Sequence, residues 1–134
     1  SPGSVGPALF RRIAANIALG NTDDHARNHA AFWDGHHLRL TPAYDVDPCR
    51  TPGWDANQAM AYGRDGQRAA NLSLLTRQAS IYDLTANEAR AIVDEILGAI
   101  ETHWDTARDI AQLTREQGAQ MRGTQILNPG TLDT

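Results

Sequence analysis

Two carboxylates and one carboxamide in the first part of the sequence have types and a spacing that could support chemistry. Asp23 and Asn28 are separated by four residues in a polar segment, residues 20–28, and Asp45 follows further along the chain. A carboxylate can accept the proton of an attacking hydroxyl group, and carboxylate and amide oxygens are ligands that suit Mg²⁺. This set could therefore support the transfer of a phosphoryl group with a metal ion bound.

The spacing between Asp23 and Asn28 indicates which class of phosphotransferase these residues resemble. Catalytic loops of protein kinases have the pattern Asp-x-x-x-x-Asn, in which the Asp accepts the proton of the substrate hydroxyl and the Asn holds Mg²⁺. The spacing has a physical reason, because both side chains must converge from one tight loop on a single phosphoryl group. The pattern predicts Asp23 as the catalytic base and Asn28 as a metal ligand.

A predicted hairpin returns Asp45 to the same place. Two short runs, residues 29–33 and 37–40, flank an Asp-Gly pair, which is a strong hairpin signal because Gly tolerates a positive φ. Neighbouring strands lie about 4.8 Å apart. Asn28 and the segment 42–45 should therefore meet at one end of the hairpin, where Asp45 could share a Mg²⁺ site with Asn28.

Helices are expected in most of the remaining chain. Periodic apolar residues predict a helix over residues 8–19, which Gly20 would end. Thr85 and Glu88 match a capping box, and the helix that they open carries an apolar stripe as far as Trp104. The expected fold class is mainly α with a small β-hairpin. Weaker patterns predict a short strand over 59–62, a short helix over 72–79 and a final helix over about 106–122.

The length of 134 residues predicts one domain. Its parts are expected to be a flexible leading segment (1–7), a functional segment with helix, catalytic loop, hairpin and metal loop (8–46), a helical part (71–122) and a loose tail (128–134).

Composition excludes several classes of protein. The net charge of −4 argues against a strongly basic face for nucleic acid. Cys49 is the only cysteine, so no intrachain disulfide can form, which fits a reducing compartment such as the cytoplasm. No apolar run is long enough to span a membrane, and residues 1–7 lack the basic and apolar regions of a signal peptide.

Two runs of residues carry a specific resemblance. Residues 20–28 read Gly-Asn-Thr-Asp-Asp-His-Ala-Arg-Asn, and residues 40–46 read Leu-Thr-Pro-Ala-Tyr-Asp-Val. The patterns Asn-Thr-Asp-x-His-x-(Lys/Arg)-Asn and Pro-Ala-Tyr-Asp are signatures of the HipA family of bacterial serine/threonine kinase toxins. Over about residues 8–110 the chain resembles the C-terminal part of such a protein, a protein-kinase-like C-terminal lobe.

The resemblance implies a role for five residues. Asp23 would be the catalytic base, and Asn28 and Asp45 would be Mg²⁺ ligands. His25 and Arg27 would line the catalytic loop, His25 as a further candidate for the chemistry and Arg27 as a candidate for binding the phosphates of ATP. Most kinases have Asp-Phe-Gly where this chain has Tyr-Asp-Val, so only the Asp is carried over.

The resemblance also implies partners. Family members phosphorylate serine or threonine of a protein, typically a translation-related target such as an aminoacyl-tRNA synthetase. They act as the toxin of a toxin–antitoxin system, are linked to bacterial persistence, and are usually neutralised by a DNA-binding antitoxin. Direct binding of nucleic acid or of a membrane by this chain is not expected.

Two parts of a complete kinase are missing from the sequence. It contains no Gly-rich phosphate loop and no lysine, since all 12 basic residues are arginines. Kinases use such a loop and such a lysine to hold ATP. We therefore expect the chain to be a fragment that depends on an N-terminal lobe and is inactive alone.

Other interpretations of the same residues stay open. His25 and His29 have a spacing that binds zinc on a helix, but they are expected in a loop that leads into a strand. A metal-dependent phosphoester hydrolase could use Asp23, Asp24, His25 and Asp45. The chain could also be a helical interaction module in which the acidic loop is inactive.

Overall fold

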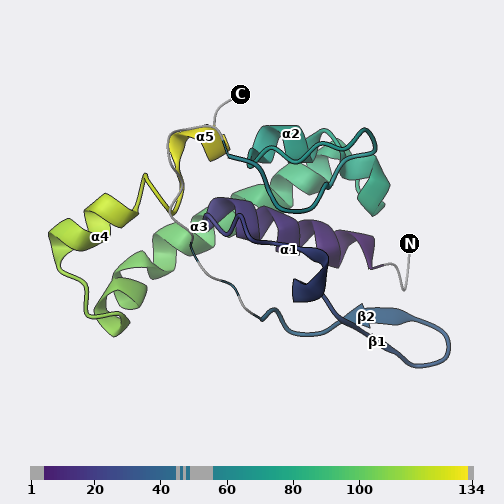
Figure 1. Ribbon diagram of the computed structural model, residues 1–134, viewed down its shortest axis with the longest axis horizontal. Helices are drawn as coiled ribbons and strands as arrows, with labels where there is room; N and C mark the ends of the chain where they lie inside the picture. The colour runs from purple at the N-terminus through teal and green to yellow at the C-terminus, as the bar shows by residue number, and fades with distance from the viewer. Residues whose placement is uncertain (1–4, 45, 47, 49–55, 133–134) are drawn as a thin grey trace.

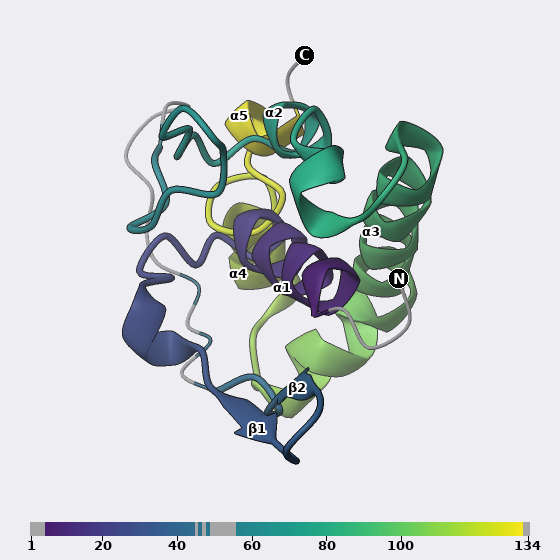
Figure 2. The ribbon, with the colours of Figure 1, turned by 90° about the vertical axis from the view of Figure 1, so that its right-hand side faces the viewer.

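The computed structural model describes residues 5–44, 46, 48 and 56–132, which form a mainly helical body and one two-stranded antiparallel sheet (Figure 1). The sheet is a hairpin that projects from the helices (Figures 1 and 2). Along the chain the helices are α1 (Gly6–Ala18), α2 (Leu72–Thr76), α3 (Ala86–Ile110), α4 (Arg115–Met121) and α5 (Pro129–Leu132), with 3₁₀ turns η1 (Ala26–Asn28) and η2 (Ala79–Tyr82). Among the described residues no helix is long and apolar enough to cross a bilayer.

Helix α1 is the centre of the molecule. Viewed along its axis, it has α3 on one side, α2 and α5 on another, and the segment that follows it on a third (Figure 2). Most of its apolar face is buried, and the ring of Phe10 meets that of Tyr82 edge-on, with centroids 5.6 Å apart. The helix begins at Gly6, within the segment predicted to be flexible, because Pro7 is compatible with a first helical turn.

The hairpin has the predicted location with shorter strands. β1 (Ala31–Trp33) pairs with β2 (Leu38–Leu40), and Ala31 lies opposite Leu40. The Asp34 side chain accepts hydrogen bonds from the backbone N–H groups of His37 and His36, which lowers the pKa of this carboxyl group. Gly35 has a φ of 95°, as the Asp-Gly signal requires. A tight turn therefore fixes the register of the two strands.

The segment predicted as a short strand over 59–62 is instead part of an irregular loop. In this region the described residues form only an isolated bridge between Asn57 and Ala69. The backbone N–H of Tyr62 donates to the carbonyl of Gln67, which closes a turn around two glycines in place of a ladder. The helix predicted over 72–79 is also split, because α2 ends at Thr76 and η2 begins at Ala79.

Helix α3 has the predicted capping box at Thr85 and Glu88, but it continues to Ile110. The break between this helix and the next, expected near residue 105, lies at residues 111–114, where Gln112 adopts a left-handed φ of 58°. Thr114 and Gln117 then form a second capping box, which begins α4. Gly118 lies inside α4, where it does not interrupt the helix. A Cβ at this position would come within 2.8 Å of Arg108 Cδ, so the glycine allows α4 to approach α3.

The end of the described chain is packed, in contrast to the predicted loose tail. Residues 129–132 form α5, and Asn128 and Thr131 are buried. The side chain of Asn71 donates to the carbonyl of Gly130, which connects α5 to the start of α2. Local composition suggested a loop here because it does not reveal contacts that are distant in sequence.

Because of Tyr62, the stability of the folded chain is expected to fall at alkaline pH. Burial, with the nearby Tyr82, raises the pKa of Tyr62 to about 12, because its charged phenolate is disfavoured in the core. In the unfolded chain the group titrates near its ordinary value of 10.0. The free energy of unfolding should therefore be unaffected below pH 10 and fall between pH 10 and 12, by up to about 3 kcal/mol.

Replacing Tyr62 by Phe should remove part of this loss. Urea denaturation at pH 9 and at pH 11, followed by circular dichroism, would compare the two proteins. Equal loss of stability in both proteins would contradict the assignment to Tyr62.

Candidate active site

The polar segment 20–28 is fixed to the C-terminal end of α1 by a glycine. Gly20 has a φ of 75°, and a Cβ on it would overlap the carbonyl oxygen of Gln125. The adjacent backbone N–H of Leu127 donates to the carbonyl of Ala18 over 2.9 Å. The loop thus begins at a close contact between α1 and the chain that precedes α5, where only glycine fits.

Replacement of Gly20 by Ala should lower the free energy of unfolding by about 2–4 kcal/mol, because it adds both backbone strain and a steric overlap. Gly66 provides a matched control, since its φ is 83° and a Cβ there would meet nothing within 4 Å. Gly66→Ala should cost about 1 kcal/mol. Urea denaturation of both variants checks the difference, and equal losses would contradict the contact with Gln125.

A network of buried polar groups attaches the loop to the helical body. The side chain of Asn21 is buried and donates to Asn16 Oδ1 over 3.0 Å, while the backbone carbonyl of Asn21 accepts a hydrogen bond from Gln58 Nε2 over 2.9 Å. The carbonyl of Thr22 accepts from the backbone N–H of Ala59 over 3.0 Å. These contacts join α1, the loop and the segment after residue 56. Sequence reasoning missed Asn16 and Gln58, because nothing in their local pattern marks a buried amide.

The structure brings Asp23 and Asn28 together through a hydrogen bond within the loop. Asn28 Nδ2 donates to the carbonyl oxygen of Asp23 over 2.9 Å, and η1 provides the turn that makes this contact possible. The Asn28 residue is 7% exposed, whereas the side chain of Asp23 is 69% exposed. Because the amide nitrogen is used inside the loop, the oxygen Oδ1 is the atom of Asn28 that suits a metal ion.

His25 and Arg27 lie in the same loop with different surroundings. His25 Nε2 is 3.9 Å from Asp23 Oδ1, which is too long for a hydrogen bond, and Nδ1 is buried without a partner among the described residues. Arg27 is exposed, and its carbonyl accepts a hydrogen bond from the Tyr44 hydroxyl over 2.6 Å. Neither side chain is bonded to Asp23, so direct chemistry by His25 and phosphate binding by Arg27 stay predictions.

The side chain of Asp24 has a structural role that the local sequence pattern does not predict. Its side chain is 3% exposed, and its Oδ1 lies 2.5 Å from Nε2 of His29, whose side chain is 11% exposed. The pair spans η1 and fastens the end of the loop to the start of the hairpin. His29 is therefore engaged with a carboxylate, which counts against a zinc site shared by His25 and His29.

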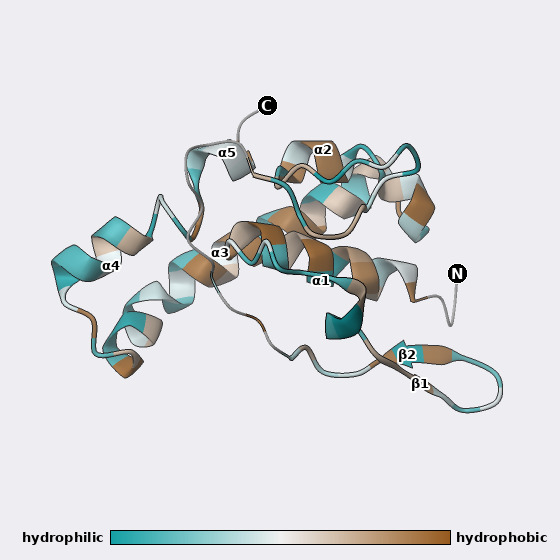
Figure 3. Ribbon diagram, in the orientation of Figure 1, coloured by the Kyte–Doolittle hydropathy of each residue, from teal (hydrophilic) through white to brown (hydrophobic). Residues whose placement is uncertain are grey.

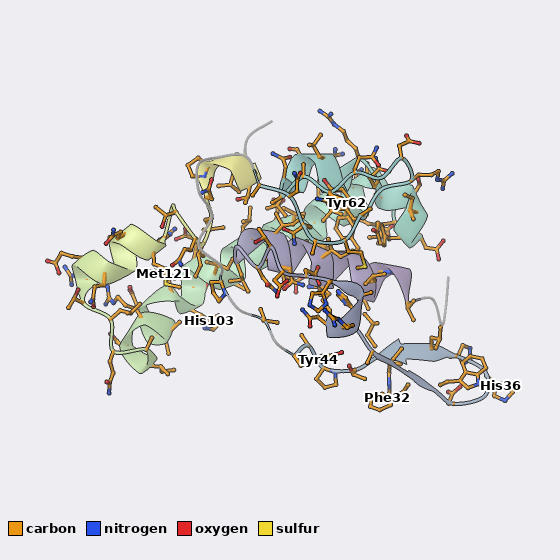
Figure 4. The ribbon with its side chains drawn as sticks, viewed as in Figure 1. Phe32, His36, Tyr44, Tyr62, His103 and Met121 are labelled. Carbon is orange, nitrogen blue, oxygen red and sulfur yellow. The ribbon has the colours of Figure 1, made fainter. Side chains whose placement is uncertain are left out.

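Two further contacts hold the chain that leaves the hairpin. Arg12, on α1, donates from Nη2 to the carbonyl of Thr41 over 2.5 Å, and the Tyr44 hydroxyl reaches the carbonyl of Arg27. Figure 4 labels Tyr44 on this segment. Segment 41–44 is thus attached both to α1 and to the candidate catalytic loop. Asp45, the residue that follows, lies outside the described residues.

The oxygen ligands expected at the candidate site suit a hard cation such as Mg²⁺. Asn28 offers an amide oxygen, and a carboxylate from Asp45 would complete an all-oxygen pair of the kind that Mg²⁺ takes together with phosphate. Within the described part of the chain, no three His, Cys, Asp or Glu side chains gather as a metal site. The ligand set therefore depends on Asn28 and Asp45, and its geometry stays a prediction.

Cavities of the helical body lie elsewhere. One of about 550 Å³ is lined by α3, α4 and the chain up to Leu132, and another of about 380 Å³ is lined by α2, α3 and Leu132. No residue of segment 20–28 lines either cavity. The loop, and not either cavity, carries the candidate catalytic carboxylate and amide groups of Asp23 and Asn28. Figure 3 shows η1 in hydrophilic colours beside the apolar α1.

Comparison with protein families gives a match over most of the chain. The model of the HipA-like C-terminal domain matches residues 4–104, a range that contains α1, the loop, the hairpin and most of α3. Comparisons with curated proteins and with solved structures gave no match.

Proposed function

The chain belongs to the family of HipA-like C-terminal domains, and from this premise we propose that it carries the catalytic loop of a serine/threonine protein kinase. In this proposal the helical body with its hairpin is the C-terminal lobe of a kinase-like fold. The observation that carries the proposal is the closed loop in which Asn28 is bonded to the backbone of Asp23, with segment 41–44 attached to the same loop.

The proposed mechanism assigns one task to each side chain. Asp23 is exposed and without a hydrogen-bonded partner on its carboxylate among the described residues, so it is free to orient a Ser or Thr hydroxyl and accept its proton. Asn28 and Asp45 would hold Mg²⁺, which when bound offsets charge on the phosphate oxygens. Arg27, on the exposed side of η1, would contact phosphate. His25 would line the loop and position the substrate.

The remaining parts of the kinase must come from other residues. The sequence has no lysine and no Gly-rich phosphate loop, so we propose that an ATP-binding lobe is supplied in cis or in trans. Without it, the 134 residues should not transfer phosphate. In keeping with the family, we further propose a cytoplasmic toxin that phosphorylates a protein and is neutralised by a DNA-binding antitoxin.

Reconstitution tests this proposal. The chain would be joined to, or mixed with, the ATP-binding lobe of a HipA-like kinase and incubated with radiolabelled ATP, Mg²⁺ and a bacterial protein extract. We expect labelled phosphoserine or phosphothreonine from the combination and none from either part alone. Absence of transfer by a combination that is folded and binds ATP would contradict the proposal.

The phosphoester hydrolase is less well supported. It would need Asp24 beside Asp23 as a metal ligand, and Asp24 is instead buried against His29. Two-metal hydrolases set their ions about 3.5–4 Å apart, which requires several carboxylates facing one space. The two neighbouring Asp side chains differ completely in exposure, so they do not form such a set.

A further inference from the structure

Two cavities with a concentration of arginines lie along α3, on surfaces that the proposed phosphotransfer does not use. The two cavities described above adjoin at Leu132, which lines both of them. In Figure 4, His103 marks α3 and Met121 marks α4, the helices that flank the larger cavity. Five arginines line the pair of cavities: Arg77, Arg90, Arg108, Arg115 and Arg122. We call this surface the arginine groove.

The charge of the groove is opposite to that of the chain. The chain has 16 acidic and 12 basic residues, and is therefore acidic overall. The lining of the two cavities instead has five arginines and two acidic residues, Glu101 in the larger cavity and Asp94 in the smaller one. Arg122 is paired with Glu101, and Arg108 lies 3.6 Å and 3.7 Å from carboxylate oxygens of Asp105 and Asp109. Among the described residues, Arg77 and Arg115 form no ion pair, and both are exposed. Arg77 and Arg115 therefore carry positive charge in the groove that ion pairs within the described chain leave unneutralised.

The groove also has an apolar floor and a fixed shape. Trp104, Leu127 and Leu132 line its larger part, and Val93 and Leu97 line the smaller part. Close approach of α4 to α3 at Gly118 sets one wall, because any larger side chain there would overlap Arg108. The floor can accept apolar side chains while the arginines receive carboxylates, which they bind through two parallel hydrogen bonds.

We propose that the arginine groove binds an acidic segment of a partner protein, with leucine-like side chains on the floor and carboxylates on the arginines. The cavities together are far larger than a single small anion needs, which favours a peptide over free phosphate. A nucleic acid strand is disfavoured because the floor has a single aromatic ring, Trp104, and stacking of successive bases needs several. This proposal is independent of the phosphotransfer chemistry, since none of its residues belongs to segment 20–28.

Binding of a defined peptide by the 134-residue chain tests the proposal. The probe is a fluorescein-labelled peptide of four Glu-Glu-Leu repeats, and its fluorescence anisotropy is measured at low and at physiological salt. We expect binding that weakens with salt, because exposed charge pairs are screened. We expect no binding of the corresponding Gln-Gln-Leu peptide. A single-stranded DNA oligonucleotide that binds more tightly than the acidic peptide would overturn the assignment to a protein partner.

Matched variants locate the site. Arg77→Gln with Arg115→Gln should weaken peptide binding about fivefold to tenfold, as the loss of two exposed charge pairs predicts. Arg64→Gln with Arg68→Gln removes the same charge from exposed residues outside the groove and should leave binding unchanged. Circular dichroism checks that both variants are folded. Equal weakening in both, or no binding of the acidic peptide by the folded wild-type chain, would overturn the proposal.

Discussion

Replacing Asp23 by Asn in the reconstituted kinase is expected to lower the rate of phosphoryl transfer by about 10²–10⁴-fold, the usual contribution of a general base. The amide cannot accept the proton of the substrate hydroxyl. The fold should be nearly unaffected, because the Asp23 side chain is 69% exposed and the bond from Asn28 reaches its backbone carbonyl. The free energy of unfolding should change by less than about 0.5 kcal/mol.

The matched control for this variant is Asp65→Asn, which removes the same charge from an exposed loop residue far along the chain. Initial rates with radiolabelled ATP would be compared for the three proteins at equal ATP binding. Asp65→Asn should retain the wild-type rate. A rate for Asp23→Asn within twofold of the wild type would remove Asp23 from the mechanism.

Replacing the adjacent residue, Asp24, should have the opposite outcome for stability. Asp24→Ala is expected to lower the free energy of unfolding by about 2–4 kcal/mol, since it leaves the largely buried ring of His29 without its partner. For a domain of this size, that loss corresponds to a decrease in Tm of roughly 5–15 °C. Thermal and urea denaturation followed by circular dichroism would measure it.

A double-variant cycle separates the pair from other contacts. Asp24→Ala with His29→Ala should cost less than the sum of the two single replacements, because each single variant already breaks the same contact. Additive losses would mean that the two side chains do not stabilise one another. Full stability of Asp24→Ala, with loss of metal binding, would instead revive the hydrolase interpretation.

The features that sequence reasoning predicted correctly are those fixed by a few neighbouring residues. The hairpin depends on the Asp34 side chain and on the positive φ of Gly35, which both follow from residue type. The start of α3 depends on the reciprocal bonds of Thr85 and Glu88. Helix α1 was predicted because its apolar residues recur at helical spacing and Gly20 follows them.

Boundaries set by contacts distant in sequence could not be predicted in this way. The stop between α3 and α4 depends on the left-handed Gln112, a conformation that glutamine rarely signals. The start of α4 is an exception, because the capping box of Thr114 and Gln117 is a local pattern that the sequence does carry. The packing of residues 128–132 depends partly on the Asn71 side chain, which donates from the start of α2.

In the candidate site, too, local features could be predicted from the sequence and contacts distant in sequence could not. The spacing of Asp23 and Asn28 predicts that they share a loop, and in the structure Asn28 Nδ2 donates to the backbone carbonyl of Asp23, whereas their catalytic roles stay predictions. The supports of the loop were not predictable, because the pairing of Asp24 with His29 and of Asn21 with Gln58 depends on how the chain folds back on itself. Convergence of Asp45 on the loop stays a prediction.

This convergence is the central claim, and Mn²⁺ is the probe that tests it most directly. Mn²⁺ takes the same oxygen ligands as Mg²⁺ and broadens the NMR signals of nearby nuclei. In the ¹⁵N-labelled 134-residue chain, we predict that a small amount of Mn²⁺ broadens both the Asn28 side-chain amide and the backbone amide of Asp45, and that Asp45→Asn restores the Asn28 signal. An Asn28 signal that broadens equally in Asp45→Asn, or that Mn²⁺ leaves sharp while broadening Asp65, would contradict the claim.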